Sequence, residues 1–368
     1  MPATPLQQLA DHGQSVWIDF LSRKFIQEGD LAALVDEGVK GVTSNPTIFQ
    51  SAIADGDAYD EQLREILKTE TDPKEVFLKL ACRDIQAACD ELRRVHDEGG
   101  GRDGWVSLEV DPNLAHDTEG TIEEAVRLHA LVDRPNLFVK IPATRECLPS
   151  IEESIARGIP INVTLVFSLE RHREVAEAYL SGLERLAQDG GDLTKVASVA
   201  SFFVSRVDTE ADKRLDAIGG HDELKGKLAI ANAKLAYQSY KELFSGERWQ
   251  ALESKGASSQ RCLWASTSTK NPDYRDVIYV EELIGPETVN TMPRETVEAF
   301  EDHGEVRDSL EEDVDGARRT LEALAAAEID YDDVVETLER EGVEKFAKSF
   351  QQLFADVDAK RRSLEPVA

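Results

Sequence analysis

Six polar residues lie at or near the ends of short apolar segments, where a buried strand would otherwise carry aliphatic side chains. Side chains alternate between two faces along a strand. Lys140, for example, opposes Val139 and Ile141 in its segment. The same alternation selects Asp19, Asn45, Glu109, Lys140, Asn162 and Thr164. We therefore expect a lysine, two carboxylates and three neutral hydrogen-bonding groups on one side of the predicted strands.

A lysine beside two carboxylates is suited to covalent chemistry at a carbonyl group. Burying the Lys140 ammonium among Phe138, Val139 and Ile141 would cost several kcal/mol unless it is paired or neutral. A neutral amine attacks a ketone or aldehyde to form an imine, which withdraws electrons from the adjacent carbon–carbon bond. One carboxylate can then remove the hydroxyl proton that drives retro-aldol cleavage, while the other acts through water as the imine forms.

Each residue also has an ordinary structural explanation. Asp19 could cap a helix, and Asn45 could be a turn residue before a proline. Glu109 could be a solvated strand end, and Lys140 could extend its amine to the solvent. The polar residues within 160–165 could be ordinary strand positions. The convergence of all six under one rule favours a functional site.

The elements that would position these residues are eight short apolar segments separated by long amphipathic ones. The predicted strands are Ser15–Asp19, Lys40–Asn45, Gly104–Val110, Asn136–Ile141, Pro160–Leu165, Val196–Phe202, Arg261–Ser266 and Thr288–Met292. Helical periodicity covers Ala58–Leu67, Pro73–His96, Thr121–Val132, Leu148–Arg157, Leu169–Gln188, Asp222–Phe244 and Pro272–Leu283. This alternation predicts an α/β fold, a (β/α)8 TIM barrel, whose active site would form at the carboxyl ends of the strands.

Additional helices are expected after the last strand. They are predicted at Glu295–Phe300, Val306–Ala327, Tyr331–Arg340 and Val343–Leu364. We therefore expect residues 1–300 to form a catalytic barrel and residues 301–368 to form a helical extension packed on it.

The composition limits the partners. With 72 Asp and Glu against 42 Lys and Arg, the formal net charge is −30, which disfavours binding to nucleic acid or to anionic membranes. No apolar run is long enough to span a bilayer, and the first residues lack the pattern of a secretory signal. The four cysteines show no metal-ligand spacing, so we expect reduced thiols and a cytoplasmic location.

An anionic substrate would need local cations to offset this charge. Arg206 follows the sixth predicted strand and Lys270 follows the seventh, at the end of the barrel where phosphate sites often form. Arg206 could instead form an ion pair with Asp208 or Glu210.

Four segments resemble the transaldolase family over roughly residues 14–300. They are Gly41–Phe49 (GVTSNPTIF), Ser107–Pro112 (SLEVDP), Asn136–Ser168, which includes LFVKIP and NVTLVFS, and Ser201–Arg206 (SFFVSR). The resemblance implies that Lys140 forms the Schiff base and that Asp19 handles the hydroxyl proton of the cleaved bond. It also implies that Glu109 activates a catalytic water held by Thr164. The dihydroxyacetone hydroxyls and the phosphate would be bound by Asn45, Asn162, Ser201 and Arg206. Lys270 stands in a segment (ASTSTKN) that departs from the shorter family members, and it is the expected second phosphate cation.

The activity implied by this resemblance is the transfer of a dihydroxyacetone unit in the pentose phosphate pathway. The donor would be sedoheptulose 7-phosphate or fructose 6-phosphate, and the acceptor glyceraldehyde 3-phosphate or erythrose 4-phosphate. No metal or organic cofactor is implied, and the chain would act as a monomer or homodimer. Two alternatives remain: an aldolase of the fructose 6-phosphate type, which releases free dihydroxyacetone, and a non-catalytic barrel that binds sugar phosphates.

Overall fold

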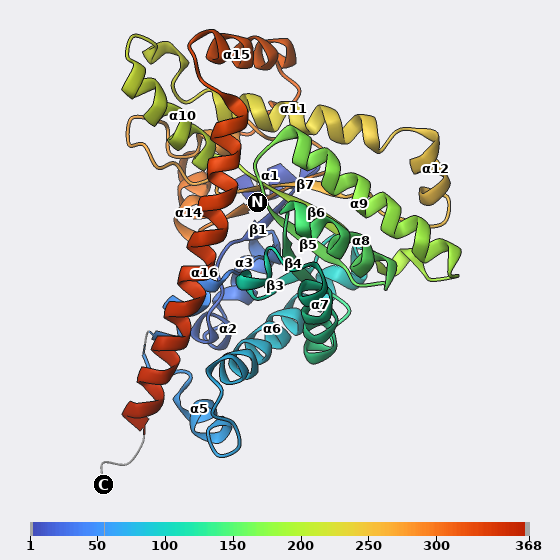
Figure 1. Cartoon of the computed structure of the whole chain (residues 1–368), viewed down its shortest axis with the longest axis vertical. Coiled ribbons are helices and arrows are strands. Elements are labelled where there is room, and N and C mark those ends of the chain that lie inside the picture. The colour runs from blue at the N-terminus through green and yellow to red at the C-terminus, as the bar shows by residue number, and fades with distance from the viewer. Residues whose placement is uncertain (1–2, 55, 365–368) are drawn as a thin grey trace.

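Eight parallel strands close into a barrel in the computed structural model, which describes residues 3–54 and 56–364 (Figure 1). The strands are β1 (Gln14–Ile18), β2 (Val39–Val42), β3 (Trp105–Glu109), β4 (Leu137–Pro142), β5 (Ile161–Val166), β6 (Ser198–Phe203), β7 (Arg261–Ala265) and β8 (Thr288–Met292). They follow one another in chain order around the barrel, and β8 pairs with β1. Each predicted strand overlaps one of these strands, with ends that differ by a few residues at most, so the predicted fold class is confirmed.

Helices surround the barrel and cover one of its ends. They are α1 (Pro5–Asp11), α2 (Arg23–Gln27), α3 (Asp30–Glu37), α4 (Pro46–Ala54), α5 (Asp60–Ile66), α6 (Pro73–Glu98), α7 (Thr118–Val132), α8 (Leu148–Ala156), α9 (Leu169–Gln188), α10 (Ser205–Ile218), α11 (Leu228–Leu243), α12 (Glu247–Glu253), α13 (Ile278–Glu281), α14 (Arg294–His303), α15 (Val314–Ala326) and α16 (Tyr331–Leu364). Short 3₁₀ turns form at Pro112–Leu114, Arg145–Cys147, Leu193–Lys195 and Asp222–Leu224.

Three predicted helical segments are helical over only part of their length. Residues 222–227 form a 3₁₀ turn and a loop before α11, and only α13 forms within residues 272–283. Residues 306–313 precede α15, which begins at Val314 after the N-cap Asp313. The six helices α1, α2, α3, α4, α10 and α12 were not predicted. Most of these are short, so their apolar periodicity is too brief to stand out.

The last two predicted helices are one continuous helix, α16, and the predicted break at residues 341–342 is wrong. Glycine often ends a helix by adopting a positive φ, but Gly342 does not do so here. It lies instead where α16 approaches the barrel, and a Cβ on Gly342 would lie 3.0 Å from Leu165 Cδ2. The glycine therefore allows a close contact rather than ending the helix.

The amino-terminal end of the barrel is filled by aromatic rings and a buried ion pair. Trp105 and Phe138 stack with their ring centroids 4.2 Å apart. Trp17 occupies the space beside Gly41, where any Cβ would lie 2.5 Å from the indole. Asp103 accepts hydrogen bonds from Trp17 and Arg261 within this layer. Packed side chains therefore close the barrel interior beneath the polar groups of the site, rather than leaving an open channel.

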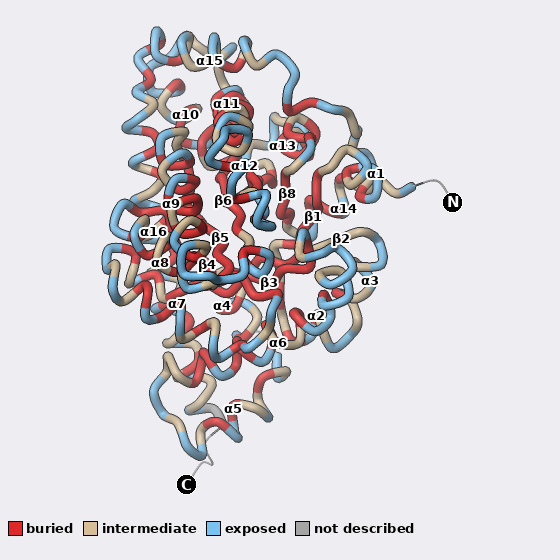
Figure 2. The backbone as a smooth tube through the Cα atoms, turned by 90° about the vertical axis from the view of Figure 1, so that its right-hand side faces the viewer, coloured by how far each residue is buried: buried red, intermediate tan, exposed pale blue. Residues whose placement is uncertain are grey.

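The long helix α16 packs against α4, α6, α10 and β5 (Figures 1 and 2). Its apolar face includes Phe350, whose ring lies 5.6 Å from that of Phe77 on α6. Figure 2 shows the buried strands at the centre of the molecule, with α16 along one side. The domain boundary at residue 300 stays a prediction, and residues 365–368 of the predicted extension lie outside the described residues.

Other predictions from composition concern the membrane and the thiols. Within the described part of the chain, no helix has the length and apolar character needed to cross a membrane. Met1 and Pro2, which belong to the segment considered for a secretory signal, lie outside the described residues. All four cysteines are buried and free, as expected.

Candidate active site

Lys140 on β4 and Glu109 on β3 face each other inside the barrel. The two residues are in register, and Lys140 Nζ lies 3.3 Å from Glu109 Oε2. Lys140 Nζ also donates a hydrogen bond to the Ser44 carbonyl at 3.2 Å. The side chains are only 6% and 4% exposed, so neither the solvated-strand-end explanation of Glu109 nor the solvent-directed explanation of Lys140 holds. A buried ion pair therefore occupies the centre of the site.

Asp19 follows β1 and belongs to the same group of charges. Its Oδ1 accepts a hydrogen bond from Thr43 Oγ1 at 2.7 Å, and Thr43 Oγ1 also contacts Thr291 Oγ1. Asp19 does not cap a helix, because α2 begins later and its N-cap is Ser22. The carboxylate is therefore held at the strand end with its charge directed to the site.

Burial raises the pKa of both carboxyl groups. For Asp19, loss of hydration outweighs the opposing effects of Lys140, the Thr43 hydroxyl and Arg206. For Glu109, burial likewise raises the pKa, while Lys140 lowers it and Asp19 adds a small further rise. Carboxyl groups with raised pKa values can accept and return protons at neutral pH, as acid–base catalysis requires.

A chain of neutral groups lies beside this pair. Asn162 Nδ2 on β5 donates to Ser107 Oγ at 3.0 Å, and Ser201 Oγ on β6 donates to Asn162 Oδ1 at 2.7 Å. All three residues are buried, and the chain fixes the orientation of the amide. Ser107 was not among the predicted site residues, although it shares a strand face with Glu109 and could have been found by the same alternation.

Thr164 on β5 carries a buried hydroxyl without a hydrogen-bond partner among the described residues. The strand is irregular here: the pairing of β5 with β6 shifts between Val163 and Val166, and Leu165 has a φ of 60°. Such bulges redirect side chains and are common beside active sites. An unsatisfied buried hydroxyl is costly, so Thr164 is a natural binding point for a water or a substrate atom.

Asn45 has a structural role in the loop after β2. Its Oδ1 accepts a hydrogen bond from the Ile48 amide at 3.1 Å at the start of α4, as expected for a turn residue. The preceding residue, Ser44, connects this loop to the site: its carbonyl receives Lys140 Nζ, and its hydroxyl donates to the Ser107 carbonyl. Ser44 was not among the predicted site residues, because a serine before an asparagine carries no distinctive signal.

Arg206, in the first turn of α10, is half-buried and forms no ion pair with Asp208 or Glu210. Asp208 accepts hydrogen bonds from the Ala229 amide and from Tyr279, while Glu210 pairs with Lys213 and Arg214. The guanidinium lies 5.1 Å from the centre of the Phe203 ring. Burial lowers the pKa of Arg206, and the negative charge of Asp19 opposes this effect.

Lys270 lies in the loop after β7 and is exposed. Its Nζ donates to Ser268 Oγ at 2.7 Å, and no carboxylate in the described part of the chain lies within ion-pair distance of it. The structure thus leaves this predicted phosphate cation unpaired as well.

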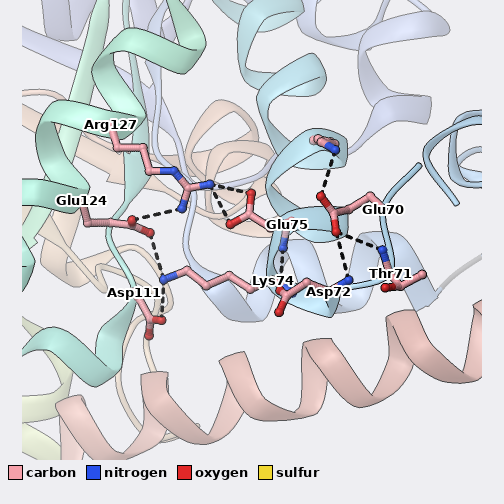
Figure 3. Close-up of polar contacts among 9 residues, drawn as sticks. Glu70, Thr71, Asp72, Lys74, Glu75, Asp111, Glu124 and Arg127 are labelled. Carbon is pink, nitrogen blue, oxygen red and sulfur yellow. Dashed lines mark hydrogen bonds and ion pairs between the residues drawn. The ribbon is translucent and has the colours of Figure 1, made fainter. Parts of the chain in front are cut away.

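A peripheral ion-pair network supports the strand end that carries Glu109 (Figure 3). Asp111, two residues beyond Glu109, accepts Lys74 Nζ at 2.9 Å, and Lys74 also lies 3.1 Å from Glu124 Oε1 on α7. Arg127 joins Glu124 to Glu75 on α6 in the same network (Figure 3). These contacts tie the β3–α7 connection to two helices and thereby hold Glu109 in place.

The side chains that could bind a metal ion are dispersed. In residues 3–54 and 56–364, no group of three or more histidine, cysteine, aspartate or glutamate side chains is arranged to hold a metal ion.

The fold and the site define a class: a (β/α)8 barrel enzyme with a buried lysine amine in contact with a buried carboxyl group inside the barrel. A family model described as Transaldolase/Fructose-6-phosphate aldolase matches residues 16–357. The chain therefore belongs to the transaldolase/fructose-6-phosphate aldolase family, as the resemblance predicted.

Several curated relatives cover nearly the whole chain. A protein named Transaldolase from Acidothermus cellulolyticus is 54% identical over 98% of this chain and 97% of its own length. Relatives with the same name from Frankia alni and Thermobifida fusca are each 53% identical, over 96% and 95% of this chain and 97% and 96% of their own lengths. The prediction that the protein is an enzyme is confirmed by this similarity.

Proposed function

We propose that the protein is a transaldolase that transfers a dihydroxyacetone unit between sugar phosphates through a Schiff base on Lys140. The observation that carries this proposal is the buried contact of 3.3 Å between Lys140 Nζ and Glu109 Oε2, in an enzyme of this family. The barrel geometry supports the chemistry because an amine, two carboxyl groups and two cations lie at one end of the strands, and neither cation forms an ion pair with a carboxylate among the described residues.

The first half of the reaction forms the imine. Lys140 passes a proton to Glu109, and the neutral amine attacks the C2 carbonyl of the ketose phosphate. Glu109 returns this proton, through a water bound at Thr164, to the oxygen of the carbinolamine, and then relays a second proton from the carbinolamine nitrogen to the same oxygen. The oxygen leaves as water, and a protonated imine with one N–H remains on Lys140.

The second half breaks and forms a carbon–carbon bond. Asp19 removes the proton of the C4 hydroxyl, the C3–C4 bond breaks, and its electron pair moves toward the imine nitrogen. The aldose phosphate leaves, and a neutral enamine remains. Its C3 then attacks the aldehyde of the acceptor, while Asp19 returns its proton to the new hydroxyl. Water finally hydrolyses the imine and releases Lys140.

The remaining residues bind and orient the substrate in this proposal. Asn162 and Ser201, already joined by a hydrogen bond, present amide and hydroxyl groups to the dihydroxyacetone portion, together with Asn45. Arg206 and Lys270 bind the phosphate. Donor and acceptor are the sugar phosphates of the pentose phosphate pathway named above. A cytoplasmic location and a monomeric or homodimeric state stay predictions.

The proposal is tested by trapping the imine. The protein is incubated with fructose 6-phosphate, reduced with borohydride and digested, and the modified peptide is identified by mass spectrometry. We expect an adduct on Lys140, lost in Lys140→Met and retained in Lys195→Met, which alters a lysine whose side chain is 79% exposed. An adduct on another lysine would contradict the site assignment.

A parallel assay separates transfer from hydrolytic aldolase activity. Glyceraldehyde 3-phosphate release from fructose 6-phosphate is followed with and without erythrose 4-phosphate. We expect sustained turnover only with the acceptor. Equal turnover in both conditions would identify an aldolase, and substrate binding without any trapped adduct would identify a non-catalytic barrel.

A further inference from the structure

A third basic side chain, Lys345, lies at the same end of the barrel as Arg206 and Lys270, and it comes from α16. None of the three forms an ion pair with a carboxylate within residues 3–54 and 56–364. Three neighbouring basic side chains without an acidic partner are unexpected in a chain with 72 acidic and 42 basic residues. The cluster cannot be seen in the sequence, because Lys345 is 75 residues beyond Lys270 (345 − 270).

The contacts of its neighbours place Lys345 over the barrel mouth. The next residue, Phe346, is buried, and its ring centre lies 5.7 Å from Lys140 Nζ. Gly342, one turn earlier, packs against Leu165 at the end of β5. Successive residues on a helix point about 100° apart, so Lys345 projects beside the ring that covers the amine. On that side α16 packs against α10, whose first turn carries Arg206.

The electrostatics agree with this placement. The pKa of Lys345 is lowered chiefly by the positive charge of Arg206, then by partial burial, and then by the charge of Lys270. Like charges held together without a counter-ion destabilise one another. A phosphate monoester carries a charge of about −1.5 to −2 near neutral pH and would relieve this repulsion.

We propose that Lys345 is a phosphate-binding residue of the active site, the third cation around the substrate phosphate. This inference rests on the proposed function, because it places the phosphate of both donor and acceptor among Arg206, Lys270 and Lys345. One helix, α16, then contributes two adjacent residues with different tasks. Lys345 binds the phosphate, and Phe346 covers the amine that reacts with the carbonyl group.

The test compares Lys345→Met with Lys348→Met, a change of an exposed lysine one turn further along the same helix. Inorganic phosphate binding is measured directly by calorimetry, and KM is measured for fructose 6-phosphate. We expect Lys345→Met to weaken phosphate binding and raise KM by about tenfold each, the loss expected for one charge-assisted hydrogen bond. Lys345→Arg should retain most of the affinity, and Lys348→Met should match the wild type.

A second measurement separates binding from structure. Unphosphorylated dihydroxyacetone is trapped on Lys140 with borohydride, and we expect Lys345→Met to be trapped as fast as the wild type. Unchanged phosphate affinity in Lys345→Met, an equal loss in Lys348→Met, or slower trapping of dihydroxyacetone in Lys345→Met would overturn the inference. If the wild type itself gives no Lys140 adduct, the proposed function fails, while the calorimetric comparison still decides whether Lys345 binds phosphate.

Discussion

Lys140 and Glu109 hold two charges in a place where neither is well hydrated. Transfer of the proton from Lys140 to Glu109 neutralises both groups at once, and the raised pKa of Glu109 is consistent with that transfer. In the proposed mechanism, this transfer to Glu109 releases the amine that attacks the carbonyl group. Asp19 stands apart from this exchange, because its hydrogen bond to Thr43 fixes it at the end of another strand.

We expect protonation of Asp19 to cause the loss of kcat at low pH, which is the acid limb of the pH–rate profile. Burial raises the pKa of Asp19 above the ordinary value of 3.8. As the pH falls, the Asp19 carboxylate is therefore protonated at a higher pH than an ordinary aspartate. We expect Asp19→Asn to lower kcat by about 10²- to 10⁴-fold and to remove this limb, while dihydroxyacetone is still trapped on Lys140. An acid limb that persists in the residual activity of Asp19→Asn would assign it to another group.

We expect a substitution of Thr164 to lower the activity without lowering the stability of the protein. Its hydroxyl is fully buried without a protein partner among the described residues, so Thr164→Val should leave the free energy of unfolding unchanged or raise it by up to about 1 kcal/mol. If the hydroxyl holds the water used by Glu109, turnover should fall by about 10- to 100-fold. Urea unfolding and single-turnover imine formation measure the two effects.

A matched control is Thr121→Val on α7. The Thr121 hydroxyl donates to the Leu114 carbonyl at 2.9 Å, so its loss should destabilise the protein without slowing imine formation. If Thr164→Val instead behaves like this control, the hydroxyl of Thr164 is structural.

At the level of whole elements, polar contacts connect α10, which carries Arg206, to α11, to α13 and to the loops that precede them. Asp208 on α10 accepts hydrogen bonds from the Ala229 amide at the start of α11 and from the Tyr279 hydroxyl on α13. Asp212, one turn later, accepts hydrogen bonds from the Gly226 amide and the Tyr274 hydroxyl. The position of α10, and therefore of Arg206, depends on these hydrogen bonds of Asp208 and Asp212.

The buried carboxyl group of Asp208 should make the free energy of unfolding depend on pH. Burial raises the pKa of Asp208 from 3.8 to about 7, so the folded state binds this proton more tightly than the unfolded state. The resulting stabilisation is complete below pH 3.8, declines as the pH rises, and is lost above about pH 7. We expect the stability of Asp208→Asn relative to the wild type to increase by up to about 1.4 kcal/mol per pH unit in this range and then to level off.

The measurement is urea unfolding of both proteins at pH 5, 6, 7 and 8, as a test of linkage. Asp273→Asn, which changes an exposed aspartate of the neighbouring loop, is the control and should run parallel to the wild type. A stability difference between Asp208→Asn and the wild type that does not vary with pH would show that Asp208 does not titrate in this range.

For the molecule as a whole, the net charge of −30 opposes both compaction and the approach of anionic substrates. Many acidic residues are paired locally, as in the network of Figure 3, but the excess remains. Arg206, Lys270 and Lys345, which form no ion pair with a carboxylate in the part of the chain that the structure describes, make a positive region at the barrel mouth within this negative field. The proposed phosphate site lies in this positive region.

Salt should therefore stabilise the protein. Between roughly 0.05 and 0.5 M KCl the Debye length shortens to a few ångströms, and repulsion between distant carboxylates is screened. We expect the midpoint of thermal unfolding to rise by at least about 2 °C. Chloride is the appropriate anion, because sulfate stabilises proteins by exclusion and would occupy a phosphate site. A fall in the midpoint would show that local ion pairs outweigh long-range repulsion.

The amino-acid sequence by itself determined the barrel and most of the residues of the site. Alternation along each strand identified Lys140, Glu109 and Asn162 as inward-facing, and the structure brings these residues onto neighbouring strands in register. This works because a parallel barrel leaves each strand residue only two directions, and because the carboxyl ends of all strands meet on one side. The shared motifs added the expected roles, which the proposed experiments test.

Contacts between distant segments were decided only by the tertiary structure. Ser44 reaches Lys140 through a backbone carbonyl, which any residue type possesses. Phe346 and Lys345 lie on a helix whose apolar periodicity indicates that one face is buried. The pattern does not tell which part of the protein covers that face. Where α16 crosses the barrel depends on side-chain packing at Gly342 and Leu165, and such packing is set by shape in three dimensions rather than by local pattern.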